Sequence, residues 1–217
     1  MKQALKQTDK AELTVQDSGC KKIIQDLSKI GQGMVPPEQR EMLDTFIQYF
    51  YTNPSMELFE RTSHKDVAKA LVDLWQFFQK RTPGDTSMRI FRVTPTADQA
   101  FAERIVIDII NPNMAFLVDS MYGLLERLGT KARLLFHPIY QVTRDGKGIL
   151  QSIEPPQAQG QRELQESFIH CEIVDNTSDE LIEALKQELP KMIDDITKAN
   201  VDWIAMRTQA LSCVKEI

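Results

Sequence analysis

Apolar residues between positions 18 and 82 recur at every third or fourth position, which is the spacing of amphipathic helices. Three stripes have this spacing, and they consist of Ile23, Ile24, Leu27 and Ile30, of Met42, Leu43, Phe46, Ile47 and Phe50, and of Val67, Ala70, Leu71, Leu74 and Phe78. Gly31 ends the first stripe, and Pro83 with Gly84 ends the third. We therefore predict a helical segment over residues 18–84, preceded by a polar, disordered tail over residues 1–17.

Beyond Met88 the pattern changes to short runs rich in β-branched residues, which are typical of strands. Five runs have this character, and they read MRIFRV, ERIVIDII, KARLLFHPIYQVTR, ILQSI and ESFIHCEIV. The third run is expected to bend, or to lie at an edge of the sheet, near Pro138, and the turn DGKG leads it back into the fourth. Helical spacing returns over residues 113–128, which Gly129 would cap, and again after a capping box formed by Thr177 and Glu180.

The order of these elements predicts the fold class. Strand, helix, hairpin, strand and helix make up most of a βαββαβ ferredoxin-like sheet, which here lacks only its final strand. The run MRIFRV could supply an edge strand in that place. We predict an α+β protein, in which the helical segment precedes an antiparallel sheet with helices packed on one face. The sheet unit should cover residues 88–199, and a C-terminal helix over residues 200–217 should lead to a further domain.

Composition and charge narrow the classes of partner. The chain of 217 residues is 42% apolar and 26% charged, which is ordinary for a soluble globular protein. A net charge of −5 argues against a nucleic-acid partner. The three cysteines, Cys20, Cys171 and Cys213, form no CxxC motif and suit a reducing compartment. The sequence shows neither a secretory signal nor a membrane span, so we expect a cytoplasmic protein without a membrane partner.

The nine glycines form none of the motifs that bind phosphate or activate a nucleophile. GxGxxG, GxxxxGK[ST] and GxSxG are all missing from the sequence. Gly146 and Gly148 come closest, but they lie in a hairpin turn and not between a strand and a helix. We therefore predict no catalytic residue and no cofactor-binding residue in this segment.

One sheet face is expected to gather polar residues. If the strand with Asp108 lies beside residues 166–174, alternation places Asp108, His170 and Glu172 on one face, which His137 could share. These residues would suit a metal or acid–base site, or cross-strand polar pairs on a face that meets another domain or subunit. We favour the second interpretation, because strand residues two apart share a face whether or not metal binds. No metal site is thus predicted, and the predicted interface comprises Asp108, Leu135, His137, Phe168, His170 and Glu172.

The start of the helix over residues 113–128 is the candidate ligand site. Free amides at a helix N-terminus can hold a carboxylate, and asparagine with proline suits such a start. The predicted effector-binding residues are Asn111, Asn113, Met114 and Ala115. On the helix side opposite the core, Phe116 lies beside Gly123 and indicates a contact surface, so Phe116 joins the predicted interface.

The segments NPNMAFLVDSMYGLLERLG, RLLFHPIYQVTRD and ESFIHCEI resemble the N-terminal region of the large bacterial NAD-specific glutamate dehydrogenases. The resemblance runs from about Ser18 to the C-terminus and includes LWQFFQKRTPGDTSMRIF and WIAMR. It implies an ACT-like module, a βαββαβ unit that often binds amino acids at its strand-to-helix turn. The usual ACT turn reads D-x-P-G-L, and here Phe116 stands where that glycine lets a ligand approach the backbone.

The resemblance implies a function as well as a fold. Our main hypothesis is a non-catalytic regulatory and assembly segment of an enzyme that converts glutamate and NAD to 2-oxoglutarate, ammonia and NADH. The catalytic domain would lie far downstream, so NAD belongs to the parent enzyme and this segment holds no cofactor. Implied partners are the rest of the parent chain, further copies in a homo-oligomer and an amino-acid effector. The alternatives are an amino-acid-binding ACT-type sensor, and an enzyme that uses Asp108, His137, His170 and Glu172.

Overall fold

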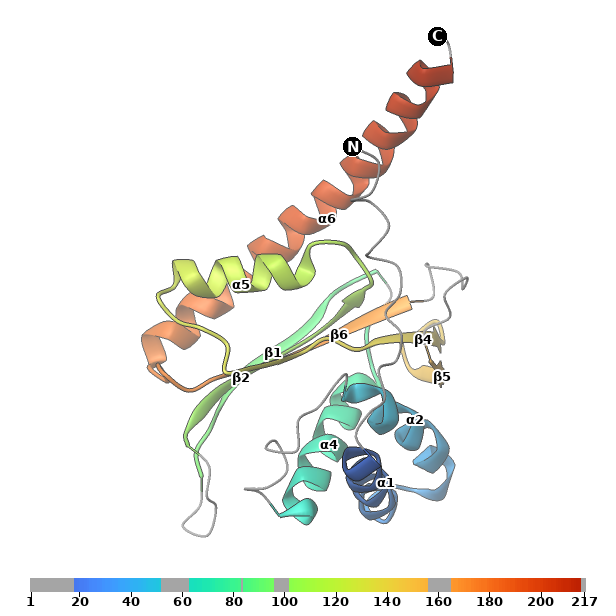
Figure 1. Ribbon diagram of the computed structural model, residues 1–217, viewed down its shortest axis with the longest axis vertical. Coiled ribbons are helices and arrows are strands. Elements are labelled where there is room, and N and C mark those ends of the chain that lie inside the picture. The colour runs from blue at the N-terminus through green and yellow to red at the C-terminus, as the bar shows by residue number, and fades with distance from the viewer. Residues whose placement is uncertain (1–17, 52–62, 83, 96–101, 156–164, 216–217) are drawn as a thin grey trace.

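The computed structural model describes residues 18–51, 63–82, 84–95, 102–155 and 165–215 (Figure 1). The helices are α1 (Ser18–Gln32), the short 3-10 helix η1 (Pro37–Gln39), α2 (Arg40–Phe50), α4 (His64–Phe78), α5 (Leu117–Arg127) and α6 (Asp179–Lys215). The strands are β1 (Ser87–Val93), β2 (Arg104–Pro112), β3 (Leu134–Phe136), β4 (Ile139–Arg144), β5 (Leu150–Glu154) and β6 (Gln165–Ile173). In the described part of the chain, no helix combines the length and the apolar character that a membrane span requires.

The sheet is antiparallel and has the order β1-β2-β6-β4-β5, with β3 also paired to β6. The run MRIFRV forms β1 at the edge beside β2, where a ferredoxin-like sheet has its last strand. The third predicted run is interrupted between β3 and β4, where Phe168 donates its backbone N–H to the carbonyl of Pro138 at 3.0 Å. Both halves still pair with β6, so the predicted bend and the predicted α+β fold are confirmed.

Helices α5 and α6 cover one face of the sheet (Figure 1). Alternate residues of β2 and β6 point to these helices because side chains along a strand alternate between faces. The core on this side contains Ile105, Ile107, Ile109, Ile169, Cys171 and Ile173 from the strands, Leu117, Met121, Leu124 and Leu125 from α5, and Leu181, Leu185, Leu189 and Ile196 from α6. This face therefore has the helices that the sequence predicts.

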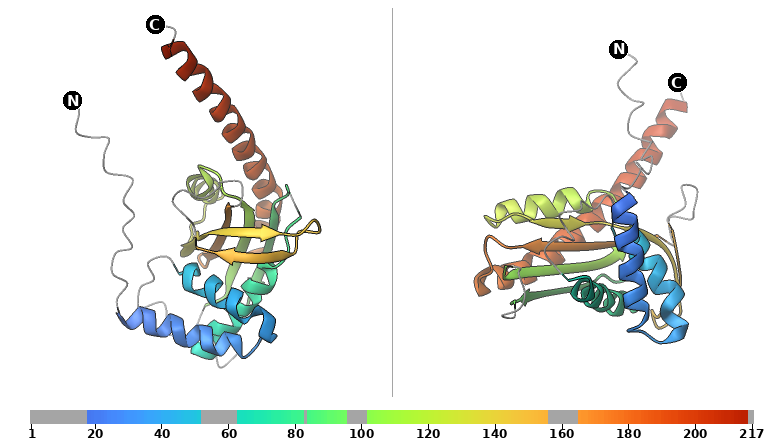
Figure 2. Two further views of the ribbon diagram at one scale, coloured as in Figure 1. Left: turned by 90° about the vertical axis from the view of Figure 1, so that its right-hand side faces the viewer. Right: turned by 60° about the horizontal axis from the view of Figure 1, so that its bottom comes forward.

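The opposite face meets the N-terminal helices near the β4–β5 end of the sheet (Figure 2). Ile110, Phe136, Tyr140 and Phe168 from the strands share a core with Phe46, Phe50, Trp75 and Phe78 from α2 and α4. The Tyr140 hydroxyl also donates a hydrogen bond to the carbonyl of Phe46 at 3.0 Å. The helical segment and this end of the sheet thus bury their apolar side chains against each other.

Candidate functional site

The turn between β2 and α5 contains the four residues predicted to bind an effector. Asn111 and Pro112 are the last residues of β2, and α5 begins at Leu117, later than the predicted helix start at residue 113. The predicted start was wrong because β2 continues to pair with β6 as far as Pro112, which draws the chain away from a helical path. Phe116 precedes α5 with a φ of 71°, in the left-handed region, and no side chain caps this helix.

The polar groups of this turn are bonded to α6 and β6. The Ala115 N–H donates to Asn200 Oδ1 at 3.1 Å, and Asn200 Nδ2 donates to the Ala115 carbonyl at 3.1 Å. Asn113 donates its backbone N–H to the carbonyl of Gln165 at 2.9 Å and its side-chain amide to Gln165 Oε1 at 3.1 Å. The Thr197 hydroxyl lies 3.7 Å from the sulfur of Met114. The groups expected to hold a ligand carboxylate are thus engaged by the chain's own carboxamides.

Asn111 differs from the rest of the turn. Its side chain is fully buried and donates from Nδ2 to the carbonyl of Pro112 at 2.8 Å, while Oδ1 has no hydrogen-bond partner among the described residues. A buried, unpaired amide oxygen is costly, so it is an unusual feature of a native site. Asn111 lies opposite Ser167, whose hydroxyl is 2.8 Å from His137 Nε2. Burial lowers the pKa of His137, so these three side chains are uncharged at neutral pH.

The predicted cross-strand group forms around His170. Asp108 lies opposite His170 in the register of β2 and β6, and His170 Nδ1 is 2.7 Å from Asp108 Oδ1. His170 Nε2 is 3.7 Å from Glu172 Oε1 on the same face. Burial lowers the pKa of His170, but the hydrogen bonds and negative charges of Asp108 and Glu172 outweigh burial and raise it to about 9.

Two residues predicted for this face lie elsewhere. Leu135 is opposite Cys171 and packs on the side of α5 and α6, because Phe136 and not Leu135 is opposite His170. A shift of one residue along a strand moves a side chain to the other face, so the expected position of Leu135 was wrong. His137, in the break between β3 and β4, bonds to Ser167 and does not join His170.

Arginines complete the ion pairs around this group. Arg89 Nε is 2.7 Å from Asp108 Oδ2, and Arg89 Nη2 is 2.6 Å from Asp73 Oδ2 on α4. Arg104 and Arg133 contact Glu172 at 2.8 and 3.5 Å. Both ring nitrogens of His170 face carboxylates of the chain itself, which leaves neither of them directed at a substrate, so this geometry suits a structural network better than acid–base catalysis. Among the described residues, no cluster of histidine, cysteine and carboxylate side chains could hold a metal ion.

The apolar part of this face is covered by the chain's own helices. Phe168 is fully buried, and its ring centroid lies 6.0, 5.9 and 5.8 Å from those of Phe46, Phe50 and Phe78. Phe50 also lies 5.8 Å from the His170 ring. The N-terminal helices are therefore one partner of this face, and pairing of the face with another subunit stays a prediction.

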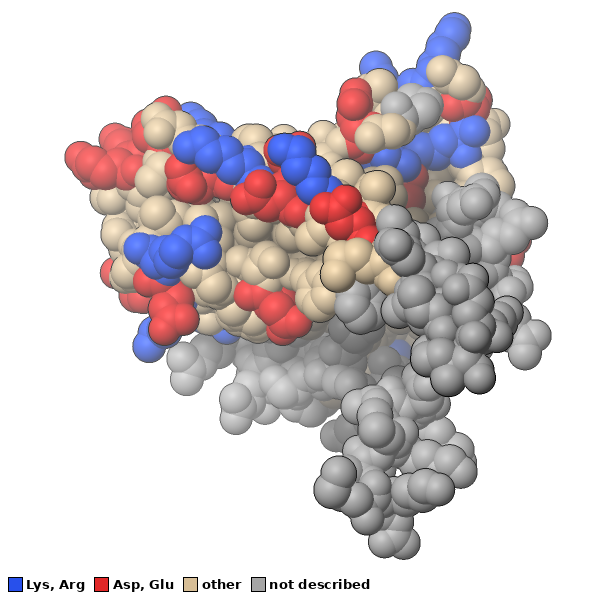
Figure 3. Space-filling model, turned by 90° about the horizontal axis from the view of Figure 1, so that it is seen from above, with Lys and Arg blue, Asp and Glu red and all other residues tan. Residues whose placement is uncertain are grey.

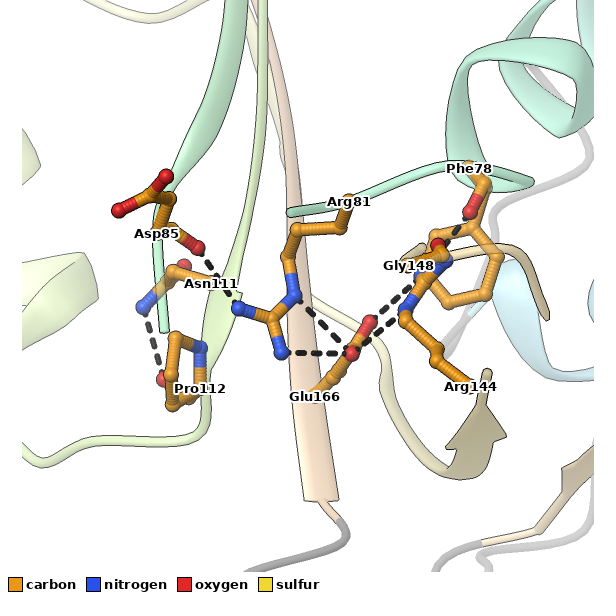
Figure 4. Close-up of polar contacts among 8 residues, drawn as sticks. All are labelled: Phe78, Arg81, Asp85, Asn111, Pro112, Arg144, Gly148 and Glu166. Carbon is orange, nitrogen blue, oxygen red and sulfur yellow. Dashed lines mark hydrogen bonds and ion pairs between the residues drawn. The ribbon is translucent and has the colours of Figure 1, made fainter. Parts of the chain in front are cut away.

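A second buried ionic group, at the start of β6, was not predicted (Figure 4). Arg144 donates from Nε and Nη2 to the two oxygens of Glu166 at 2.8 and 2.7 Å, and Arg81 donates from Nε and Nη2 to Oε1 at 3.0 and 2.8 Å. The remaining donors reach the backbone carbonyls of Phe78, Asp85 and Gly148. Glu166 is two and four residues before Phe168 and His170, so the alternation of β6 indicates that it shares their face. No spacing in the sequence relates Glu166 to the two distant arginines.

Gly148 fits against this group at close range. Its backbone carbonyl accepts a hydrogen bond from the Arg81 N–H at 3.0 Å, and its φ is 80°. A Cβ at Gly148 would lie 2.0 Å from the Arg81 carbonyl oxygen, which no side chain can do. Gly148 of the DGKG turn is therefore required by the junction between α4 and β5.

Comparison with known proteins places this arrangement in a family. The model of the glutamate dehydrogenase ACT1 domain matches residues 46–189, from within α2 to within α6. The chain belongs to this family. The NAD-specific glutamate dehydrogenase of Halomonas elongata is 23% identical over 195 residues, which are 90% of this chain and 12% of that protein. The enzymes of that name from Pseudomonas aeruginosa and Mycobacterium tuberculosis are 21% and 24% identical over 76% and 58% of this chain, and 10% and 8% of their own lengths.

The chain thus spans about a tenth of the length of these curated relatives. No solved structure matches it. The family match includes all six strands and α5, so the predicted ACT-like character and the predicted family are confirmed.

Proposed function

We propose that this chain is a non-catalytic regulatory and assembly module of an NAD-specific glutamate dehydrogenase. The proposal rests on the ACT1 family match, together with relatives of that name of which this chain matches only 10–12% of the length. Glutamate and NAD would then bind in another part of the parent enzyme, which produces 2-oxoglutarate, ammonia and NADH. We place the protein in the cytoplasm, which agrees with the free, buried thiol of Cys171.

The two ionic groups support a structural role for their residues. His170 bonds to one carboxylate at each side, and the Glu166 carboxylate is held by two buried guanidinium groups. A catalytic acid or base must release and recover a proton at a position that substrate can reach. Charges that are buried and paired in this way instead hold strands and helices together.

The first test is an assay of the purified chain with glutamate and NAD. We expect no NADH above the rate given by an identical purification from cells that do not express the chain. NADH formation that His170→Gln abolishes, while the circular dichroism spectrum stays unchanged, would contradict the non-catalytic role.

The second test uses a full-length glutamate dehydrogenase that contains this module. Phe46→Ala should disturb the assembly of the enzyme or its response to amino acids, because Phe46 joins the helices to the sheet. The KM for NAD should stay unchanged. An effect confined to the KM for NAD would contradict the proposal.

The structure also favours a second candidate function, an amino-acid sensor at the β2–α5 turn. The supporting observation is Asn111, whose buried Oδ1 is unpaired among the described residues and could accept from the ammonium group of an amino acid. The Ala115 N–H, now bonded to Asn200, could donate to the carboxylate of the same ligand. In this function Asn200 competes with the ligand for the turn.

Calorimetric titration with the common amino acids tests the sensor. Asn200→Ala removes the competing hydrogen bond and should strengthen binding about fivefold to tenfold, whereas Asn111→Leu should abolish binding. Asn176→Ala, in the loop before α6, is the matched control and should leave the affinity unchanged. If no amino acid gives heat even with Asn200→Ala, the module is not such a sensor.

A further inference from the structure

The outer face of α5 contains two residues that are unfavourable for their local backbone. Phe116 has a φ of 71°, a conformation that bulky residues rarely adopt, and its side chain is 52% exposed. Gly123 lies in the interior of α5, where glycine is among the least favourable residues. Phe116 and Gly123 are seven residues, about two turns, apart, so they lie on the same side of the helix. This side is opposite the buried positions of α5.

Contacts within the described chain do not account for either residue. The half-exposed ring of Phe116 gains little from burial that would offset its backbone conformation. A Cβ at Gly123 would meet only Arg127 Nη1, at 4.0 Å, so an alanine would fit there without strain. Residues that are locally unfavourable, and that contacts among the described residues do not explain, commonly mark functional surfaces.

We propose that this face of α5 pairs with α5 of a second copy of the same chain. The two helices run antiparallel about a twofold axis at Gly123, whose missing side chain lets the backbones approach. This pairing deepens the assembly role proposed above by naming its surface and its partner. Seen from above, uncharged residues form a broad area of this side of the molecule, with charged side chains of both signs along its borders (Figure 3).

Charge complementarity selects the antiparallel arrangement. Asp119 and Arg127 are both exposed and lie four positions before and after Gly123, about 6 Å along the helix from the axis. Antiparallel pairing therefore places Asp119 of each copy opposite Arg127 of the other, which forms two equivalent ion pairs. Parallel pairing would instead bring like charges together at both positions, which is unfavourable.

The same axis gives Phe116 a partner. Phe116 lies about 10 Å from the axis, so it reaches the far end of the other α5, where Gly129 ends the helix. Gly129 is exposed, and the position of its missing Cβ has no atom within 4 Å. The aromatic ring can therefore lie against bare backbone there, and an exposed aromatic side chain becomes buried at the contact.

Sedimentation equilibrium of the chain over a range of concentrations tests the pairing. We expect a reversible dimer of the unaltered chain. Gly123→Leu and Phe116→Gly should each weaken it by about tenfold or more, because the first fills the contact at the axis and the second removes an aromatic side chain that the contact buries. Both substitutions also improve the local backbone, so the melting midpoint should not fall at a concentration at which the chain is monomeric. Weaker pairing can then not be attributed to unfolding.

Exchange of charges is the stricter test. Asp119→Arg places like charges opposite each other and should weaken the dimer, and adding Arg127→Asp should restore it. Asp119→Arg is the cleaner single variant because Arg127 also lies near Glu188 of α6. A chain that stays monomeric, a dimer insensitive to Gly123→Leu, or a double variant that does not recover would each overturn the proposal. These measurements involve no dehydrogenase reaction, so they leave the proposed regulatory role to its own assays.

Discussion

Phe116 occupies the position at which the β2–α5 turn would accept a glycine most easily. A left-handed conformation costs a residue with a Cβ about 1–2 kcal/mol. Glycine avoids this cost, but part of the advantage is lost because glycine also gives the unfolded chain more conformational freedom. The residue is 52% exposed, so burial against the described residues offsets only part of this cost. The sequence shows only that Phe116 replaces a glycine in the turn, whereas its positive φ is seen in the structure.

We predict that Phe116→Gly raises the free energy of unfolding by about 1 kcal/mol. Ala115→Gly is the control, because Ala115 has no positive φ and glycine there only adds freedom to the unfolded chain. Urea titration of both variants, followed by circular dichroism, measures the difference. A loss of stability with Phe116→Gly would mean that the ring makes contacts that its exposure conceals.

His170 makes the stability of the folded protein depend on pH in the neutral to alkaline range. Its pKa is about 9 in the folded chain, compared with an ordinary value of 6.5 in the unfolded chain. A raised pKa stabilises the folded state fully below pH 6.5. Between pH 6.5 and 9 the folded state binds more protons than the unfolded state, so this contribution declines as the pH rises. His170→Gln should therefore reduce the fall in stability over this window. The free energies of unfolding of both proteins at pH 6 and 9 measure the effect, and equal slopes would exclude His170 as its source.

The ion pairs show what the sequence could and could not predict. Asp108 and His170 were expected on one face because both follow the alternation of their strands, and they are hydrogen-bonded. Arg81 and Arg144 were not expected beside Glu166, because one follows a helix and the other ends a strand. Contacts between segments so far apart depend on how the sheet packs against the helices, and the periodicity of apolar residues in the sequence does not show this packing.

The start of β6 is a junction of three elements. Through Arg144, Glu166 is linked to the carbonyl of Phe78 at the end of α4 and to Gly148 just before β5. Backbone hydrogen bonds from Arg81 to Gly148 and from Leu150 to Gln79 lie beside it. Glu166 therefore fixes how the helical segment meets the sheet, and it does so from a site with little contact with solvent.

We predict that Glu166→Gln lowers the free energy of unfolding by about 3–5 kcal/mol, because it leaves two buried guanidinium groups without their carboxylate. Glu183→Gln is the matched control, since Glu183 pairs with Lys186 at the surface and such pairs contribute about 0–1 kcal/mol. Chemical denaturation of both variants provides the comparison. Similar losses would show that the Glu166 group is not specially stabilising.

The boundaries of helices were the least predictable feature of the elements. At α4, Ser63 caps the helix, because its hydroxyl accepts from the Asp66 N–H at 3.2 Å and donates to Asp66 Oδ2 at 2.7 Å. At α6 the predicted cap was wrong, because Ser178 accepts from the Leu181 N–H while the Thr177 hydroxyl donates to Glu103. Thr177 and Ser178 are both suited to cap α6. The local sequence does not show which of the two hydroxyl groups will instead bond to a residue elsewhere in the fold.

Aromatic contacts unite the helical segment with the sheet. Phe46 lies 5.4 Å from Tyr140 and 6.0 Å from Phe168 on the sheet, and 5.6 Å from Trp75 on α4. The sequence predicted a helical segment over residues 18–84. The shared core leads us to expect that it does not fold by itself.

We predict that the helices and the sheet unfold in one transition. In a Trp203→Phe variant, the fluorescence of buried Trp75 reports on α4, and circular dichroism reports on the whole chain, so the two denaturation curves should coincide. Phe46→Ala should shift both curves by the same amount, at a cost of about 3–5 kcal/mol. Separate midpoints would instead indicate two independent units.

The strand order has a consequence for how the protein forms during synthesis. β2 does not pair with β4, and each of them pairs with β6. The ribosome releases β1 with β2, and then β4 with β5, as two hairpins before β6 emerges. In these hairpins the edges of β2 and β4 that later pair with β6 are unpaired, and unpaired edges invite pairing with other chains. A nascent chain that pauses before residue 165 is therefore most exposed to aggregation, and the entry of β6 between β2 and β4 covers both of these edges at once.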